Sequence, residues 1–178
     1  MAAHKEVAIR SRKMTLDYFW NLVQAVHHDS DGDMDLKCKL LDERLRKLTC
    51  DEVRAFGEHF GKLVYRAYSW ELWAAAFIIG HGCSDDSFMD FRSALISMGR
   101  DVFENALVDP ESLADINYSA EQAFYEGYQY IVGKVYRHMG GQRVPRFRTR
   151  PAEPSGRKWE ETKVAELYPK LARHYNFP

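Results

Sequence analysis

The sequence predicts an all-α fold, a single compact domain of about seven or eight helices around a central apolar helix at residues 70–79. Three observations support this. Apolar residues recur every three or four positions, two capping boxes mark helix starts, and no segment alternates polar and apolar residues with a period of two. With 178 residues, of which 46% are hydrophobic, the chain can bury one core without disulfide bonds.

The first helix is expected to begin at Thr15 and to end in the acidic, glycine-containing stretch at 29–33. A leucine stripe over residues 36–48 predicts the second helix. Thr49 and Glu52 form a capping box, in which each side chain bonds the backbone of the other residue. This box begins the third helix.

The fourth helix, over residues 70–79, carries apolar residues on opposite faces, which is typical of a helix at the centre of a fold. The sequence Gly80-His-Gly82 ends it. Ser84, Asp85 or Asp86 can then cap a fifth helix, which carries its own apolar stripe. The two helices are therefore expected to be joined by a short turn.

The second half of the domain is expected to contain a short helix through residues 102–107 and then a long one. Ser119 and Gln122 form the second capping box, which begins the long helix. Its apolar stripe reaches Met139, and Gly140-Gly141 ends it.

The composition divides the chain into four segments. Residues 1–13 are expected to form a disordered N-terminal tail, and residues 14–141 the helical core domain. Residues 142–158 are rich in proline and arginine, which predicts a basic surface connector. Residues 159–178 form a C-terminal helical segment, interrupted by Pro169, whose apolar residues predict docking on the core.

Charge and cysteine content narrow the class of protein. The 25 basic and 26 acidic residues leave a net charge of −1, which gives no global field that attracts DNA or anionic lipid. Cys38, Cys50 and Cys83 are odd in number and show no C-x-x-C spacing, which favours a reducing cytoplasm. No stretch approaches the roughly 20 apolar residues of a membrane-spanning helix, so no membrane partner is expected.

One block of the sequence carries a family resemblance. It runs from Trp70 to Arg100, with Gly82-Cys-Ser-Asp-Asp86 and Phe91-Arg92 at its centre, and continues through 103–107 and 109–113. The block resembles the uncharacterised bacterial domain-of-unknown-function family 4240. The likeness covers roughly residues 15–139 and implies no activity, cofactor or catalytic residue for this chain.

The residues best suited to chemistry gather around the turn between the fourth and fifth helices. They are His81, Cys83, Asp85, Asp86, Arg92 and Arg100. A turn that leads into a helix offers free N–H groups and lowers the pKa of a nearby thiol, so it can bind an anion or hold a thiolate. The alternative is structural, because Arg92 lies on the buried stripe and needs a carboxylate from Asp85 or Asp86.

Two function classes follow from this cluster. The first is a non-enzymatic binding or regulatory module that recognises a protein or a small anionic ligand through the Gly82–Asp86 turn. The alternative is a small hydrolase or group transferase. It would use Asp85 or Asp86 as general base and Arg92 or Arg100 to hold an anionic substrate. A solvent-filled cavity shared by these side chains would favour the enzyme, and no cofactor is expected.

The basic connector is the other candidate binding segment. Its basic residues surround one aromatic ring, Phe147, and comprise Arg143, Arg146, Arg148, Arg150, Arg157 and Lys158. Such a pattern can grip phosphates and stack a base. We expect a solvated linker instead, and no nucleic-acid partner, because no recognised nucleic-acid-binding fold accompanies it.

The acids at 31–42 partly match a calcium loop but should bind no metal. Leu36 stands at the position where such a loop requires glycine, and Lys37 and Lys39 add positive charge. Millimolar calcium should therefore leave the melting temperature unchanged in a thermal scan. A calcium-dependent rise that disappears in Asp31→Asn would contradict this prediction.

Overall fold

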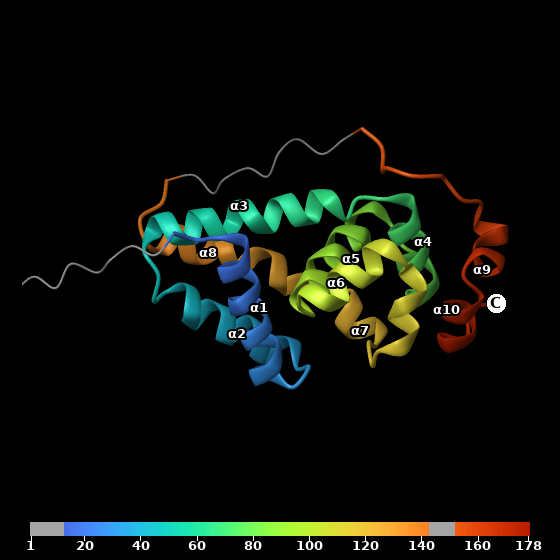
Figure 1. The fold of residues 1–178 in the computed structure, drawn as a ribbon, viewed down its shortest axis with the longest axis horizontal. Coiled ribbons are helices and arrows are strands. Elements are labelled where there is room, and N and C mark those ends of the chain that lie inside the picture. The colour runs from blue at the N-terminus through green and yellow to red at the C-terminus, as the bar shows by residue number, and fades with distance from the viewer. Residues whose placement is uncertain (1–12, 143–151) are drawn as a thin grey trace, which may run out of the picture.

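The computed structural model describes residues 13–142 and 152–178. The expected N-terminal tail, apart from Lys13, and residues 143–151 of the connector lie outside the described residues. The fold is all-α, as the sequence predicted (Figure 1). None of the described helices is both long and apolar enough to cross a bilayer.

The α-helices, in chain order, are α1 (Leu16–Ser30), α2 (Met34–Leu45), α3 (Cys50–Arg66), α4 (Trp70–Ile79), α5 (Asp85–Ser97), α6 (Arg100–Val108), α7 (Ala120–Ala123), α8 (Ile131–His138), α9 (Val164–Leu167) and α10 (Pro169–His174). Within the described ranges, three short 3-10 helices complete the order, η1 (Pro110–Asp115), η2 (Glu126–Tyr130) and η3 (Glu161–Lys163). Figure 1 shows α1, α2, α3 and α8 in one half of the molecule and α4 to α7 in the other. The two C-terminal helices lie at the edge beside α4.

Side-chain caps fix where the helices begin. Thr15, Asp33, Ser69 and Ser84 each accept a hydrogen bond from a backbone N–H in the first turn of the helix that follows. Both predicted capping boxes are confirmed, at the starts of α3 and α7. These caps occupy backbone donors that have no partner within the helix, so they set the boundaries of the elements that carry the site.

The two consecutive helices α4 and α5 are the most thoroughly buried elements. In α4 one face buries Ala74 and Ile78 and the opposite face buries Ala75, Ala76 and Ile79, as predicted. In α5 every residue from Phe91 to Ser97 is buried. Because α4 offers no solvent-facing side, other segments must cover it from several directions. Those segments include α5, α7, η1, α9 and α10.

The prediction of one long helix after Ser119 is wrong in its middle, because the structure has a break at Phe124 and Tyr125. The Phe124 ring turns into the core, 5.9 Å from the ring of Phe91, and packs against the bare Cα of Gly80. The Tyr125 hydroxyl turns the other way and donates to Asp35 at 2.5 Å. The chain leaves the helix where these two neighbouring rings contact partners on opposite sides. Tertiary packing therefore overrides the helical pattern of the sequence at Phe124 and Tyr125.

The C-terminal segment packs against α4. The indole N–H of Trp159 donates to the carbonyl of Trp70 at 2.8 Å, and its ring lies 5.0 Å from that of Phe77. Val164 and Leu171 are fully buried. Residues near the C-terminus thus cover one side of α4, the central helix of the fold.

Lys37 on α2 is a fully buried cation. Its ammonium lies 3.2 Å from Nδ1 of His27 and donates to Oγ of Ser97 at 3.3 Å and, more weakly, to the sulfur of Met98. Among the described residues, no carboxylate contacts it. Burial therefore lowers the pKa of Lys37 from 10.5 to about 8. Burial, with the nearby ammonium of Lys37, also lowers the pKa of His27.

Replacing this lysine with methionine should stabilise the protein at pH 7 by about 1 to 2 kcal/mol, because an apolar chain of similar shape removes a buried charge. The folded state loses the lysine proton above about pH 8, whereas the unfolded chain keeps it to about pH 10.5. The penalty on the parent is therefore full below pH 8 and fades above it. Denaturant melts should show the stability gap between Lys37→Met and the parent narrowing from pH 7 to pH 10. A methionine variant that is less stable at pH 7 would contradict this.

Candidate functional site

The structure does not gather the six predicted site residues into one cavity. His81 and Cys83 lie on the turn before α5, and Asp85 and Asp86 lie in the first turn of that helix. Arg100 lies beyond the far end of α5, roughly 20 Å away along a 13-residue helix. There it donates to Asp17 of α1 at 2.9 Å. It therefore cannot share a ligand with the turn.

Arg92 is a buried core residue, 2% exposed. Its guanidinium donates to the carbonyls of Val64 at 3.0 Å and Phe88 at 3.2 Å, and lies over the rings of Tyr68 and Phe88 at 4.7 and 4.8 Å. The predicted burial on the α5 stripe is confirmed. An ion pair with Asp85 or Asp86 stays a prediction. These contacts give the guanidinium a structural role between α3 and α5.

The turn itself is engaged by other parts of the chain. Ser84, rather than Asp85 or Asp86, accepts the capping hydrogen bond of α5. His81 lies within hydrogen-bond distance of the carbonyl of Tyr175, at 2.9 Å, so it holds the C-terminal end of the chain. Cys83 precedes the cap and is partly buried, and this burial raises its pKa to about 12. That shift is opposite to the one a thiolate nucleophile needs, so the structure gives the thiolate hypothesis no support.

The hollow beside the turn is acidic. Asp86 lines a pocket of about 380 Å³ together with Asp90, Glu126, Met89, Gln129 and Tyr130. Burial raises the pKa of Asp90, and the charges of Glu126 and Asp86 raise it further. A second pocket of about 440 Å³ is lined by Asp33, Asp35 and Glu121 among others. Both hollows repel anions. Among the described residues, no three histidine, cysteine or acidic side chains stand close enough to hold a metal ion.

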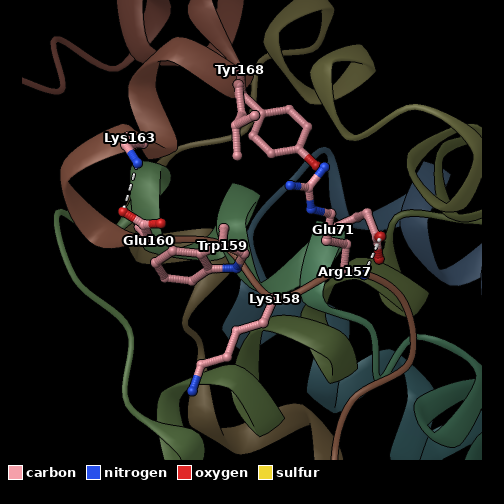
Figure 2. Close-up of a pocket in the computed structure, with 8 residues that line it drawn as sticks. Glu71, Arg157, Lys158, Trp159, Glu160, Lys163 and Tyr168 are labelled. Carbon is pink, nitrogen blue, oxygen red and sulfur yellow. Dashed lines mark hydrogen bonds and ion pairs between the residues drawn. The ribbon is translucent and has the colours of Figure 1, made fainter.

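A different pocket, of about 360 Å³, lies between the start of α4 and the C-terminal segment (Figure 2). We call it the C-terminal pocket. It is lined by Glu71, Arg157, Lys158, Trp159, Glu160, Lys163, Leu167 and Tyr168. Figure 2 shows Lys163 and Glu160 at one end, Glu71 with Arg157 at the other, and Trp159 between them. Apart from Glu71 on α4, the lining residues belong to the predicted connector and the predicted docking segment, and none of them was predicted as a site residue. The mixture of aromatic and basic residues at 157–168 is the one sequence signal that points to this pocket.

Backbone and side-chain contacts hold the walls of the C-terminal pocket. Glu71 accepts a hydrogen bond from the backbone N–H of Arg157 at 3.1 Å. Lys163 pairs with Glu160 at 2.9 Å, and the ammonium of Lys158 lies 5.2 Å from the centre of the Trp70 ring. These contacts use the main chain of Arg157, and its guanidinium has no partner among the described residues.

The chemistry of this lining suits binding. Tyr168 is half-buried, and burial raises its pKa, with the charge of Glu71 contributing, so its hydroxyl stays protonated at neutral pH. The lining residues include no thiol, imidazole or aliphatic hydroxyl that could serve as a nucleophile. Aromatic and aliphatic walls with cations at the rim can hold an apolar group next to an anionic one.

Truncating Arg92 tests its structural role. Arg92→Ala should lower the free energy of unfolding by about 3 kcal/mol, because it leaves a cavity and removes the donor from two buried carbonyls. Arg100→Ala, which breaks an exposed pair, should change it by less than about 0.5 kcal/mol. Urea melts of both variants measure the difference. If Arg92→Ala melts like the parent, the residue does not hold the core together.

The comparisons with known proteins concern the core of the chain. The model of the family described as "Protein of unknown function (DUF4240)" matches residues 14–138, from α1 to α8. No curated protein and no solved structure matches the chain. The match includes Glu71 and leaves out the other residues that line the C-terminal pocket. The resemblance seen in residues 70–113 is confirmed, and the chain belongs to the DUF4240 family of proteins of unknown function.

Proposed function

We propose that this protein is a non-enzymatic binding module that recognises an anionic segment of another protein in the C-terminal pocket. One observation carries the proposal. The guanidinium of Arg157 has no described partner and lies at the rim of a pocket with aromatic walls. A guanidinium in that position is suited to a bidentate carboxylate or phosphate.

The residue types in the pocket support a protein partner. Tryptophan, tyrosine and arginine are the residues that most often dominate the energy of protein interfaces, and here Trp159, Tyr168 and Arg157 line one hollow. Leu167 adds an exposed aliphatic side chain. Lys158 adds a second cation without a carboxylate partner among the described residues. An acidic residue beside an apolar one on the partner would complement this surface.

The geometry favours binding over the enzymatic alternative. That alternative needed Asp85 or Asp86 and Arg92 or Arg100 to face one substrate. Arg92 is buried in the core, Arg100 bonds Asp17, and Asp86 faces an acidic hollow that disfavours an anionic substrate. The same acidity moves the proposed anion site away from the Gly82–Asp86 turn to the C-terminal pocket.

We further propose that the module works in the cytoplasm. Its three cysteines, Cys38, Cys50 and Cys83, are all free thiols. Cysteines that form no disulfide bond are typical of proteins in reducing compartments.

A labelled peptide of alternating glutamate and leucine tests the proposal by fluorescence anisotropy on the full chain. We expect a dissociation constant on the order of 10 to 100 µM, with weaker binding at high salt. The double variant Arg157→Gln, Lys158→Gln should weaken binding by about tenfold, because it removes both rim cations.

Two controls make this experiment specific. The double variant Arg54→Gln, Lys62→Gln removes the same charge from the exposed side of α3 and should bind like the parent. A peptide of alternating lysine and leucine should not bind measurably. Equal loss of affinity in both double variants would overturn the assignment to this pocket, as would an absence of binding by the glutamate–leucine peptide.

A further inference from the structure

A second hollow adjoins the C-terminal pocket at Glu71. It has a volume of about 380 Å³ and is lined by Arg66, Ser69, Glu71, Leu107, Val108, Pro110 and Ser155. We call it the Val108 hollow. Glu71 lines both hollows. Ser155 lines one and Arg157 the other, so the short backbone stretch 155–157 forms the boundary between them.

This boundary is fixed to the start of α4. The backbone N–H of Ser155 donates to the carbonyl of Tyr68 at 3.0 Å, and that of Trp70 donates to the carbonyl of Ser155 at 2.8 Å. The Glu71 carboxylate then holds the N–H of Arg157. Two main-chain hydrogen bonds and one from a backbone N–H to a carboxylate therefore set the position of each hollow relative to the other, so the two form one prearranged surface.

Exposed aliphatic side chains mark both hollows. Val108, at the end of α6, is 88% exposed, and Leu167, at the end of α9, is 56% exposed. They are the two most exposed large aliphatic residues of the described chain. A single exposed apolar residue needs no explanation, but two that line adjoining hollows indicate a surface completed by a partner.

The charge of this surface indicates the chemistry of the partner. The two hollows have four basic side chains against two acidic ones, whereas the hollows near Asp33 and Asp86 are lined by acids without described bases. Arg66 is held by Glu104 in a two-pronged pair of 2.6 and 2.5 Å. Lys163 is paired with Glu160. The cations left without a described ion pair are therefore Arg157 and Lys158, next to the boundary between the hollows, and with the Glu71 carboxylate there the three side chains carry a net positive charge.

We propose that the partner is an extended acidic peptide segment of another protein, which crosses the 155–157 boundary and places an apolar side chain in each hollow. This inference rests on the proposed function. An extended strand directs alternate side chains to the same side, so two apolar residues can reach Val108 and Leu167. The long, exposed side chains of Arg157 and Lys158 can reach outward to the carboxylates between them. A single phosphate or a small carboxylate would fill one hollow and leave Val108 uncovered.

Val108→Ser tests the second half of the surface. This variant keeps an exposed helix end intact, so its unfolding midpoint should match that of the parent. Its affinity for the glutamate–leucine peptide should fall by about fivefold, because the apolar contact in the Val108 hollow is lost. Leu16→Ser on α1, at a residue 39% exposed, is the matched control and should bind like the parent. A peptide of alternating glutamate and serine should bind at least about tenfold more weakly than glutamate–leucine.

The outcomes separate this inference from the proposed function. Suppose that Arg157→Gln, Lys158→Gln weakens binding, that Val108→Ser binds like the parent, and that the glutamate–serine peptide binds as tightly as glutamate–leucine. The inference of an extended partner is then wrong, and only the proposal of an anion site in the C-terminal pocket stands. If no acidic peptide binds, both proposals fail. If a single-stranded DNA oligonucleotide displaces the bound peptide at lower concentration than unlabelled peptide does, the occupant is a nucleic acid and the acidic peptide is wrong.

Discussion

The fold depends on one constraint, that α4 is apolar around its circumference from Leu72 to Ile79 and must be covered from several sides. Its run of alanines and isoleucines leaves no face for water. Helices α5 and α7 and the 3-10 helix η1 cover part of it. The remainder is covered by the C-terminal segment, through Trp159 and Phe177 against Phe77. Residues outside the family match therefore complete the burial of a helix at the heart of the family domain.

The candidate binding surface forms because the C-terminal segment packs on α4. Where the C-terminal segment reaches α4, exposed backbone groups at Tyr68 and Trp70 find partners in Ser155 and in the indole of Trp159. Beside these contacts the Glu71 carboxylate accepts the backbone N–H of Arg157, so that its guanidinium lies at the edge of a hollow. Core burial and the proposed recognition site thus share one set of hydrogen bonds. The family domain supplies the scaffold, and the C-terminal segment supplies most of the recognition residues.

Local features were predictable from the sequence and long-range ones were not. Caps and apolar periodicity act within a few residues, so the boundaries of α4 and both capping boxes were predicted correctly. The break at Phe124 was not, because the helical pattern continues through it while the ring is drawn to Gly80 and Phe91. The burial of Arg92 was predictable from its position on the α5 stripe, whereas its contacts with the Val64 carbonyl on α3 and with the Tyr68 ring were not.

The candidate site was hidden from sequence for a related reason. Arg100 and the Gly82–Asp86 turn are near in sequence yet separated by the length of α5. Glu71 and Arg157, which meet in the C-terminal pocket, are 86 positions apart. Proximity in sequence led to the prediction of a site at residues 81–100. The pocket at Glu71 and Arg157 forms only when the C-terminal segment docks on α4.

Hydrogen–deuterium exchange on the full chain carrying Trp159→Ala tests most directly the claim that the C-terminal segment covers α4 and builds the site. The variant loses the bond to the Trp70 carbonyl and the ring contact with Phe77. We expect faster exchange across residues 152–178 and at the amide of Trp70, which bonds Ser155, with unchanged protection in α1 and α3. Unchanged exchange at Trp70 and in residues 152–178 would contradict this account, as would equal acceleration in every helix.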